Sequence, residues 1–484
     1  MVDILFVSPP TPSPEEHAGY NLNAPPLGIG YLAAILRENG FEVDAIDLAF
    51  SDKPVADLRQ KLRESDPRVV GFYTTTVTYY GTERLLAAVR KDHPEAITWV
   101  GGPHVSYEYE TALASSGFDV VFLFEAEHSV LEAAKVQLRG KGRLDDVAGI
   151  AFRRDGRTIK TTPRAREKSL DIFPYPARDL FPIKKYTRPG SIMSSRGCPV
   201  KCIFCIASTF EDAYRYRSPE NVVGEMKLMY EQWGINDFYF VDNVFTTYRA
   251  RAREICRLIR EADLPIGWYC VSRVDYAEPE LMQDLASAGC YRIELGVESG
   301  DPSVIGGMKK HISLAHVYRA ADVILNLGMQ PMFTFQVGHP HDTLDSIEAT
   351  LRLAEEIREM GAGAYLSVTT PYPGAPMMIE REKYGIVLET TNWEDFRWSN
   401  PTYRTATLSR NDIRKAIYRG AVGMARTLAE GKFQDPPSAP WLRFGPNGNG
   451  MRLPPPPTSR SDDDTALFSV PDRKRTLPVL QVAR

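Results

Sequence analysis

The sequence predicts an α/β protein in which an open, doubly wound parallel sheet precedes a partial barrel of six strand and helix units. Over the first 145 of its 484 residues, short apolar runs alternate with amphipathic stretches, which is typical of a parallel sheet covered by helices. The same alternation resumes from Ser191 to about Thr370. The length predicts two or three domains, because a domain with its own core takes roughly 100 to 200 residues.

The N-terminal domain is expected over residues 1–145. Its first helix, Leu27–Asn39, is predicted from an apolar side that includes Tyr31 and Ile35, and from Gly40, a typical C-terminal stop. The expected strands are Asp3–Val7, Phe41–Leu48, Val69–Phe72, Ile97–Val100 and Val120–Phe124, with further helices at about 55–64, 80–92, 107–115 and 128–138.

Open sheets of this kind bind ligands beyond the carboxyl ends of their strands. The loops at that edge are rich in glycine, small residues and polar residues, and they are Ser8–Pro26, Thr74–Tyr79, Gly101–Ser106 and Glu125–His128. These loops are therefore expected to hold a large cofactor.

Residues 146–190 are predicted to connect the two domains. A short strand pair at Ile150–Arg153 and Thr158–Thr161 is followed by a segment punctuated by prolines, which is typical of a linker. The barrel is expected over 191–390, with one strand before the cysteines and others at Phe238–Val241, Trp268–Ser272, Arg292–Val297, Pro331–Val337 and Ala364–Thr369. Six units are too few for an eight-fold barrel and enough for a partial one.

The C-terminal part divides into a helical region and a tail. Residues 391–435 are expected to be helical, chiefly at 410–431, and to face the substrate with the aromatic side chains Trp393, Phe396, Trp398 and Tyr403, or to form a folded cap. Ten of the 36 prolines lie from Pro436 onward, so residues 436–484 are predicted to be a tail, with a docked piece around Trp441–Phe444.

The composition excludes several classes of protein. With 58 basic and 62 acidic residues, the net charge is −4, and there is no basic excess for a nucleic acid partner. No run of about eighteen apolar residues occurs, and the N-terminus lacks the features of a signal peptide, so a cytoplasmic protein without a membrane span is expected. Six cysteines are too few for a disulfide framework.

Three of the six cysteines, Cys198, Cys202 and Cys205, form a C-x3-C-x2-C pattern directly after a predicted strand. Three thiolates on one tight loop can bind three irons of a [4Fe-4S] cluster and leave the fourth iron open for chemistry. A zinc site is the alternative, but structural zinc takes four ligands, and no fourth Cys or His lies near this loop in the sequence. Cys256, Cys270 and Cys290 are expected to be buried packing residues.

With the aromatic residue Phe204 before its last cysteine, this loop resembles the signature of the radical S-adenosylmethionine (SAM) enzymes. The resemblance implies that the open iron binds SAM, which one electron from the cluster cleaves to methionine and a 5′-deoxyadenosyl radical. It also implies SAM-binding side chains at the carboxyl ends of the barrel strands. The SAM contacts expected in this way are Phe204, Asp242, Asn243, Arg273, Glu298, Gly338 and Tyr372.

Individual roles follow from the chemistry of these side chains. Asp242 and Asn243 could bind the amino group or ribose of SAM, or could end a strand in a turn. Arg273 suits the SAM carboxylate because its planar fork matches two carboxylate oxygens, and a surface salt bridge is the alternative. Glu298 is a candidate acceptor for the ribose hydroxyls. Tyr372 is a candidate to touch the substrate, or packs.

Three N-terminal segments are similar to the cobalamin-binding domain of cobalamin-dependent radical SAM enzymes. They are Ala24–Tyr31, the Trp99-Val-Gly-Gly-Pro-His104 loop, and Glu125-Ala-Glu-His128, where the family more often has Gly-Glu-Gly-Glu. The resemblance covers roughly residues 1 to 400 and implies cobalamin contacts from Pro26, Leu27, Thr74, Thr75, Thr76, Gly101, Gly102, His104 and Glu125.

The lower face of the cobalt is expected to have no histidine ligand from the protein. The string Asp-x-His-x-x-Gly, which supplies such a ligand in other cobalamin proteins, does not occur in this chain. His104 is the one candidate for a substitute, and a hydrogen bond to the corrin or to its own backbone is the alternative role.

The resemblance implies an enzyme, most often a methyltransferase. In that family a methyl group passes from one SAM through methylcobalamin to an unactivated carbon, or to phosphorus, of a small-molecule or natural-product substrate, after a second SAM supplies the radical. The expected partners are that substrate and an electron donor such as flavodoxin or ferredoxin. Methylthiotransferases need three more cysteines before the barrel, and this chain has no cysteine before Cys198.

Three alternatives stay open at this point. The same assembly supports ring contraction or oxidative cyclisation without methyl transfer. A radical SAM enzyme lacking cobalamin is a second alternative, because an open α/β domain alone proves no ligand. A non-catalytic corrinoid-binding or scaffold protein is the third.

Overall fold

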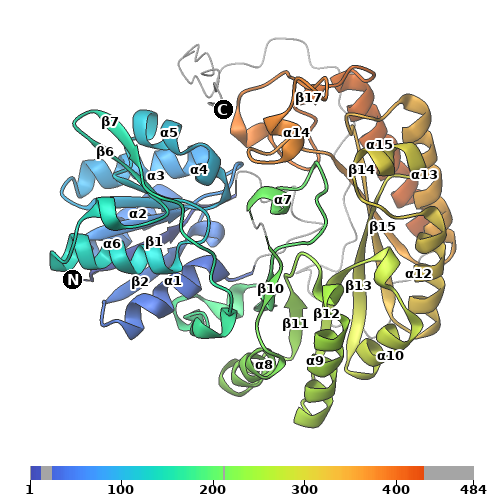
Figure 1. Cartoon of the computed structure of the whole chain (residues 1–484), viewed down its shortest axis with the longest axis horizontal. Coiled ribbons are helices and arrows are strands. Elements are labelled where there is room, and N and C mark those ends of the chain that lie inside the picture. Colours follow the sequence, from blue (N-terminus) through green and yellow to red (C-terminus); the bar gives the residue numbers. More distant parts are fainter. Residues whose placement is uncertain (1, 12–23, 211–212, 430–484) are drawn as a thin grey trace. The chain divides into compact units, whose positions relative to one another are not determined.

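The computed structural model describes residues 2–11, 24–210 and 213–429, and for residues 424–429 only the backbone. The described residues belong to one compact unit. They form a seven-stranded and a six-stranded sheet, each accompanied by helices (Figure 1). The predicted tail over 436–484 and its piece Trp441–Phe444 lie outside the described residues.

Five parallel strands form most of the N-terminal sheet, in the order β2-β1-β3-β4-β5. This is the doubly wound arrangement that the sequence predicts. The strands are β1 (Ile4–Ser8), β2 (Val43–Asp47), β3 (Val69–Tyr73), β4 (Ile97–Gly101) and β5 (Val120–Phe122). The helices are α1 (Leu27–Glu38), α2 (Pro54–Ser65), α3 (Tyr79–Asp92), α4 (Pro103–Tyr107), α5 (Tyr109–Thr111) and α6 (Glu127–Arg139).

Both faces of this sheet are apolar because successive side chains of a strand point to opposite faces. On β1, Ile4 and Phe6 belong to the apolar core that includes residues of α1 and α6. Leu5 and Val7 belong to a second core with residues of α2 and α3. Helices therefore cover both faces, which leaves the carboxyl edge of the strands for a ligand.

Two predictions for the N-terminal domain are wrong in detail. The strand pair assigned to the connector, β6 (Ile150–Arg154) and β7 (Arg157–Lys160), extends the sheet, with β6 antiparallel to β5. The buried residues Ile150, Ala151 and Phe152 pair with the whole of β5 and so cover what would be an exposed edge.

The helix expected at 107–115 begins earlier and is not continuous. It starts at Pro103, because proline is well suited to the first position of a helix. It then breaks into α4, α5 and a π-helical turn at Ala112–Ser116.

The second sheet consists of six parallel strands in the order β8-β11-β12-β13-β14-β15, so the partial barrel is confirmed and β8 and β15 are its edges. The strands are β8 (Gly190–Ile192), β11 (Asp237–Phe240), β12 (Gly267–Arg273), β13 (Cys290–Glu298), β14 (Gln330–Val337) and β15 (Gly363–Val368). The helices between them are α8 (Pro219–Trp233), α9 (Arg249–Ala262), α10 (Pro279–Ser287), α11 (Pro302–Gly307), α12 (Leu314–Asn326) and α13 (Leu344–Glu359).

Smaller elements frame the carboxyl ends of the barrel strands. A two-stranded ladder of β9 (Ser195–Arg196) and β10 (Arg215–Tyr216) flanks the cysteine loop, and the short helix α7 (Ala207–Phe210) follows it. After the barrel come α14 (Pro376–Ile379), the pair β16 (Val387–Leu388) and β17 (Tyr403–Arg404), and the expected helix α15 (Arg410–Ala429). Short 3-10 turns lie at Leu48–Phe50, Leu144–Asp146, Leu170–Ile172, Arg178–Leu180, Ile183–Lys185, Phe245–Thr247, Val274–Tyr276 and Trp393–Asp395.

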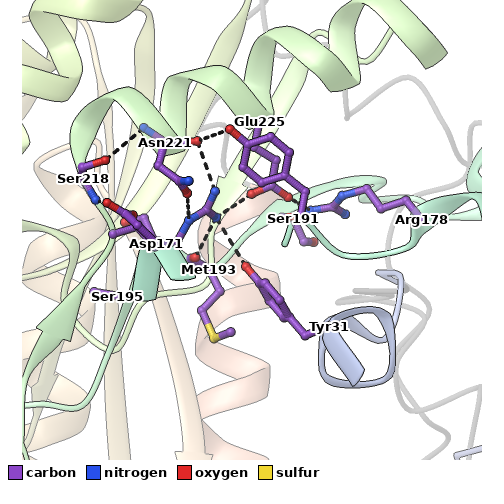
Figure 2. A network of polar contacts seen from close by, with 12 residues as sticks. Tyr31, Asp171, Arg178, Ser191, Met193, Ser195, Ser218, Asn221 and Glu225 are labelled. Carbon is purple, nitrogen blue, oxygen red and sulfur yellow. Dashed lines mark hydrogen bonds and ion pairs between the residues drawn. The ribbon is translucent and has the colours of Figure 1, made fainter. Parts of the chain in front are cut away.

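A buried polar network joins α1, the connector and the barrel (Figure 2). Glu225 of α8 accepts hydrogen bonds from Arg178 of the connector, at 2.8 Å, and from Arg217. Arg217 also donates to the Tyr31 hydroxyl of α1 at 3.3 Å. Removing the Glu225 carboxylate would leave two buried guanidinium groups without their counter-charge, which costs about 3–5 kcal/mol in comparable pairs.

Among the helices that the structure describes, none is long and apolar enough to cross a membrane.

Candidate functional site

The cysteine loop runs from β9 to α7 at the carboxyl ends of the barrel strands. Gly197 precedes Cys198 with a φ of +88°, and a Cβ at this position would lie 2.1 Å from the carbonyl oxygen of Ala213. Glycine therefore lets the loop leave the ladder. The loop then turns, because the Cys205 amide donates to the Cys202 carbonyl oxygen at 3.2 Å. It contacts the residue that follows α11, because the Ile203 amide donates to the Met308 carbonyl oxygen.

The donor set of this loop fits an iron–sulfur cluster. Cys202 is buried and Cys198 and Cys205 are partly exposed, and none of the three is in a disulfide. Burial raises the pKa of Cys202 to about 12, and a bound metal would favour its thiolate form. Among the described residues, no three His, Cys, Asp or Glu side chains converge as ligands of a single ion. Cys256, Cys270 and Cys290 are buried elsewhere, as expected.

Glu298 lies beside this loop and pairs with Lys310, a residue that the sequence does not predict for the site. The Lys310 ammonium donates to Glu298 Oε1 at 2.6 Å, and both side chains are buried. Glu298 has a φ of +75° at the end of β13, a left-handed conformation that costs a non-glycine residue energy. Gly296 makes room, since a Cβ there would lie within 2.6 Å of both charged groups.

Phe204 lies between two further polar side chains. Lys310 Nζ is 5.9 Å from the centre of its ring, and the His339 ring meets it edge to face at 6.4 Å. Burial and the neighbouring His341 lower the pKa of His339 to about 3, so its imidazole is neutral. Its Nε2 is buried without a hydrogen-bond partner. A buried orphan of this kind next to Phe204 fits a site that a ligand completes.

Gly338, directly before His339, is held in the turn after β14. Its φ is +86°, and the Tyr403 hydroxyl donates to its carbonyl oxygen. Tyr372 is partly buried and packs against the second core, next to the N-terminal sheet. The structure thus places Phe204, Glu298 and Gly338 around the cysteine loop, and Tyr372 against the second apolar core.

Asp242, Asn243 and Arg273 take other positions. Asp242 is buried and accepts from the backbone amides of Ser194 and Ser195 at 2.7 and 2.9 Å, so its carboxylate holds the segment that enters the cysteine loop. Arg273 pairs with Asp275 at 2.9 Å and also donates to the carbonyl oxygen of Lys310.

Asn243 is exposed. Asp242 and Arg273 thus have partners within the chain, and the SAM contacts expected of these three residues stay predictions.

The predicted cobalamin loops of β3 and β4 lie side by side. The Thr74 amide donates to the Gly101 carbonyl oxygen at 2.9 Å, and Thr78 Oγ1 accepts from the Thr75 amide. Gly102 has a φ of +121°, and a Cβ there would lie 2.2 Å from the Thr74 carbonyl oxygen. Only glycine allows the two loops to approach this closely.

His104 is the second residue of α4, directly after Pro103, and is buried. Its Nδ1 lies 3.3 Å from Thr76 Oγ1, and its ring contacts those of Tyr79 and Trp393 at 4.5 and 5.1 Å. Burial lowers its pKa to about 3, and its Nε2 has no hydrogen-bond partner. The orphan nitrogen and the glycine cradle fit a large ligand at this edge, with His104 as a neutral group.

The remaining predicted cobalamin residues lie on either side of this edge. Pro26 and Leu27 begin α1 and are partly exposed. Glu125, after β5, forms ion pairs with Arg215 of β10 and with Arg196 of β9, at 3.2 Å for the latter. These guanidinium groups keep the pKa of Glu125 below its usual value against the effect of burial. Its carboxylate thus ties the sheet edge to the ladder beside the cysteine loop.

The two sets of strand-end loops meet directly. Tyr107, at the end of α4, donates from its hydroxyl to Thr209 Oγ1 of α7 at 2.8 Å, and Thr209 donates to the carbonyl oxygen of Gly374. Phe124 packs against both Tyr107 and Phe210. The helix that begins within the Gly-Gly-Pro-His sequence thus contacts the helix that follows the three cysteines.

Comparison with known families agrees with this geometry. A model of the radical SAM superfamily matches residues 192–354, and a model of the B12-binding domain matches residues 18–134. The chain therefore carries a B12-binding domain followed by a radical SAM domain. Its cofactors are a [4Fe-4S] cluster, SAM and cobalamin.

Named relatives extend over most of the chain. An uncharacterized methyltransferase of Pyrococcus horikoshii is 28% identical over 431 residues, which cover 87% of this chain and 92% of the relative. The anaerobic magnesium-protoporphyrin IX monomethyl ester cyclase of Rubrivivax gelatinosus is 25% identical over 85% of this chain and 75% of its own length.

Among solved structures, the radical SAM methyltransferase TsrM of Kitasatospora setae shares the fold, with a TM-score of 0.69 and 19% identity over 81% of this chain and 79% of TsrM.

Proposed function

We propose that this enzyme transfers a methyl group from SAM to an unactivated carbon, or to phosphorus, of a small-molecule or natural-product substrate. The Tyr107 to Thr209 contact carries the proposal, because it holds the loop expected to bind cobalamin against the loop expected to bind the cluster. Methyl transfer through cobalamin needs both centres to act on one substrate. The long match to the Pyrococcus methyltransferase supports the same function.

When bound, the cofactors supply the methyl carrier and the radical, and the protein supplies binding, orientation and exclusion of water. Cys198, Cys202 and Cys205 would hold the cluster. Phe204 and Glu298 would bind SAM, together with Gly338 and the neutral donor His339. Radical abstraction needs no general base, and we assign none.

On the corrin side, the proposed contacts come from the loops of β3 and β4. Thr74, Thr75 and Thr76 offer hydroxyl and amide groups, and Gly101 and Gly102 leave space for the ligand. His104 would donate a hydrogen bond to the corrin rather than bind the cobalt, because Tyr79 and Trp393 cover its ring. Pro26 and Leu27 would flank the slot.

Substrate selection is proposed for the loops at this junction rather than for the aromatic residues after the barrel. Trp393, Phe396 and Tyr403 are buried in apolar cores, which favours a folded cap for this region. The proposed electron donor is flavodoxin or ferredoxin, and the proposed location is the cytoplasm, which the free, buried cysteines support. The relationship to the Rubrivivax cyclase supports oxidative cyclisation as the second candidate.

The decisive experiment uses the enzyme loaded with cluster and cobalamin, SAM carrying a deuterated methyl group, a one-electron reductant and candidate metabolites. Methyl transfer predicts S-adenosylhomocysteine, 5′-deoxyadenosine and a product that carries the label. Cys202→Ala is expected to abolish deoxyadenosine, whereas Cys256→Ala, a buried cysteine outside the loop, retains it. Deoxyadenosine and an unlabelled product, without S-adenosylhomocysteine, would favour cyclisation instead.

A further inference from the structure

Lys310 is a buried lysine that no motif assigns to a role. The residues on both sides of it, Lys309 and His311, are exposed and adopt left-handed backbone conformations, with φ of 58° and 57°. Two such conformations at non-glycine positions cost energy and are found where the surrounding structure requires them. Arg273 holds the segment by donating to the Lys310 carbonyl oxygen at 2.9 Å. Two left-handed residues therefore flank Lys310, whose side chain is buried.

The buried ammonium lies at the cysteine loop. It is 2.6 Å from Glu298 Oε1 and 5.9 Å from the ring centre of Phe204, the residue before Cys205. The ammonium of the ion pair therefore lies against the loop that carries the three cysteines.

Stability alone does not explain this arrangement. A buried ion pair seldom stabilises a fold relative to apolar residues of the same size, because both charges lose their hydration. The backbone strain on either side of Lys310 adds to that cost. The position beside the cysteine loop gives the charge a function, since a cation acts strongly on electron transfer at a buried centre.

We propose that the Lys310 ammonium raises the reduction potential of the cluster held by Cys198, Cys202 and Cys205. Reduction adds one electron from a low-potential one-electron donor such as flavodoxin or ferredoxin, and the added negative charge is stabilised by the adjacent cation. Lys310 acts through its charge and touches no reacting atom, so it is a tuning residue. The proposal rests on the cluster and is independent of methyl transfer.

The test measures the midpoint potential of the reconstituted full-length protein by a dye-mediated redox titration followed by electron paramagnetic resonance, without SAM, cobalamin or substrate. Lys310→Met removes the charge and keeps the length of the side chain, and its potential is expected to shift in the negative direction. Lys310→Arg keeps the charge and is expected to stay near the wild type. Lys309→Met is the matched control, because it removes an exposed charge one residue away.

Glu298→Gln supplies a second arm that does not depend on the folding of Lys310→Met. It removes the carboxylate that offsets the ammonium, so the potential is expected to shift in the positive direction. An unchanged or more positive potential in Lys310→Met, or an equal shift in Lys309→Met, would overturn the proposal. If Lys310→Met assembles no cluster, an unchanged or more negative potential in Glu298→Gln would overturn it. A failure of methyl transfer alters none of these outcomes.

Discussion

Acidification is expected to destabilise the fold through His104. This side chain is buried against Tyr79 and Trp393, and burial lowers its pKa to about 3. In the unfolded chain a histidine has a pKa of about 6.5. Above that value both states are neutral at this residue, and the full stability is present. As the pH falls below 6.5, the unfolded chain takes up a proton that the folded chain refuses, so stability is lost.

The magnitude follows from the two pKa values. At pH 5 the unfolded histidine lies about 1.5 pH units below its pKa, and each unit is worth about 1.36 kcal/mol, so His104 contributes a loss of about 2 kcal/mol between pH 8 and pH 5. The loss levels off near pH 3, where the folded state also protonates. The aromatic rings and Thr76 around His104 do not ionise in this range.

Denaturant unfolding of the protein at pH 8 and pH 5 measures this loss. His104→Asn has no titrating ring and can keep the hydrogen bond to Thr76, so its free energy of unfolding should depend on pH by about 2 kcal/mol less than that of the wild type. His311→Asn is the matched control, because this exposed histidine has a left-handed backbone that asparagine also adopts. An identical pH dependence in His104→Asn and the wild type would contradict the neutral, buried state of His104.

Three substitutions test other parts of the structure. Gly102→Ala places a methyl group against a carbonyl oxygen, so it should lower the free energy of unfolding by about 2 kcal/mol or more and should also lower the corrin content after reconstitution. Gly306→Ala, where the added methyl group has open space, should change neither quantity. Tyr107→Phe should cost about 1 kcal/mol in denaturant unfolding, through one lost hydrogen bond, and equal stability would contradict the contact. Glu225→Gln should lower the free energy of unfolding by about 3–5 kcal/mol, whereas Glu231→Gln, an exposed position on the same helix, should lower it by less than about 0.5 kcal/mol. Similar losses in the two variants would contradict the buried network.

The order of strands and helices could be predicted from the sequence because each element carries a strong local pattern. The alternation of Ile4 and Phe6 with Leu5 and Val7 places apolar residues on both faces of β1, as a covered parallel sheet requires. The pairing of β6 with β5 could not be predicted in this way. It is a long-range contact between an edge and a hairpin, and the local pattern of the hairpin is the same whether or not it joins the sheet.

The candidate site could be predicted where a backbone constraint or a ligand set is written in consecutive residues. The three cysteines and the Gly101-Gly102 loop are of this kind. Lys310 was missed because a Lys-Lys-His stretch in a loop is typical of a solvated surface. Glu298 is the residue that could have indicated a buried cation here, since a carboxylate at a buried strand end needs a cationic partner.

Asp242 shows the opposite limit. A strand-end carboxylate is a reasonable candidate for a cofactor contact, and the sequence gives no means of knowing that the amides of Ser194 and Ser195 bind it first. Burial raises the pKa of Asp242, and the charge of Arg251 and the hydrogen bonds from Ser194 and Ser195 act against that rise. The Asp242 carboxylate thus holds the segment that leads into the cysteine loop.

The proposed reaction carries a methyl group from SAM by way of cobalamin on a single chain. The most direct measurement is S-adenosylhomocysteine formation by the reduced, fully loaded enzyme before any substrate is added. The account predicts about one equivalent per bound corrin in the first turnover, and none in Gly102→Ala protein that lacks corrin. Deoxyadenosine formation without S-adenosylhomocysteine, in protein shown to contain corrin, would contradict it.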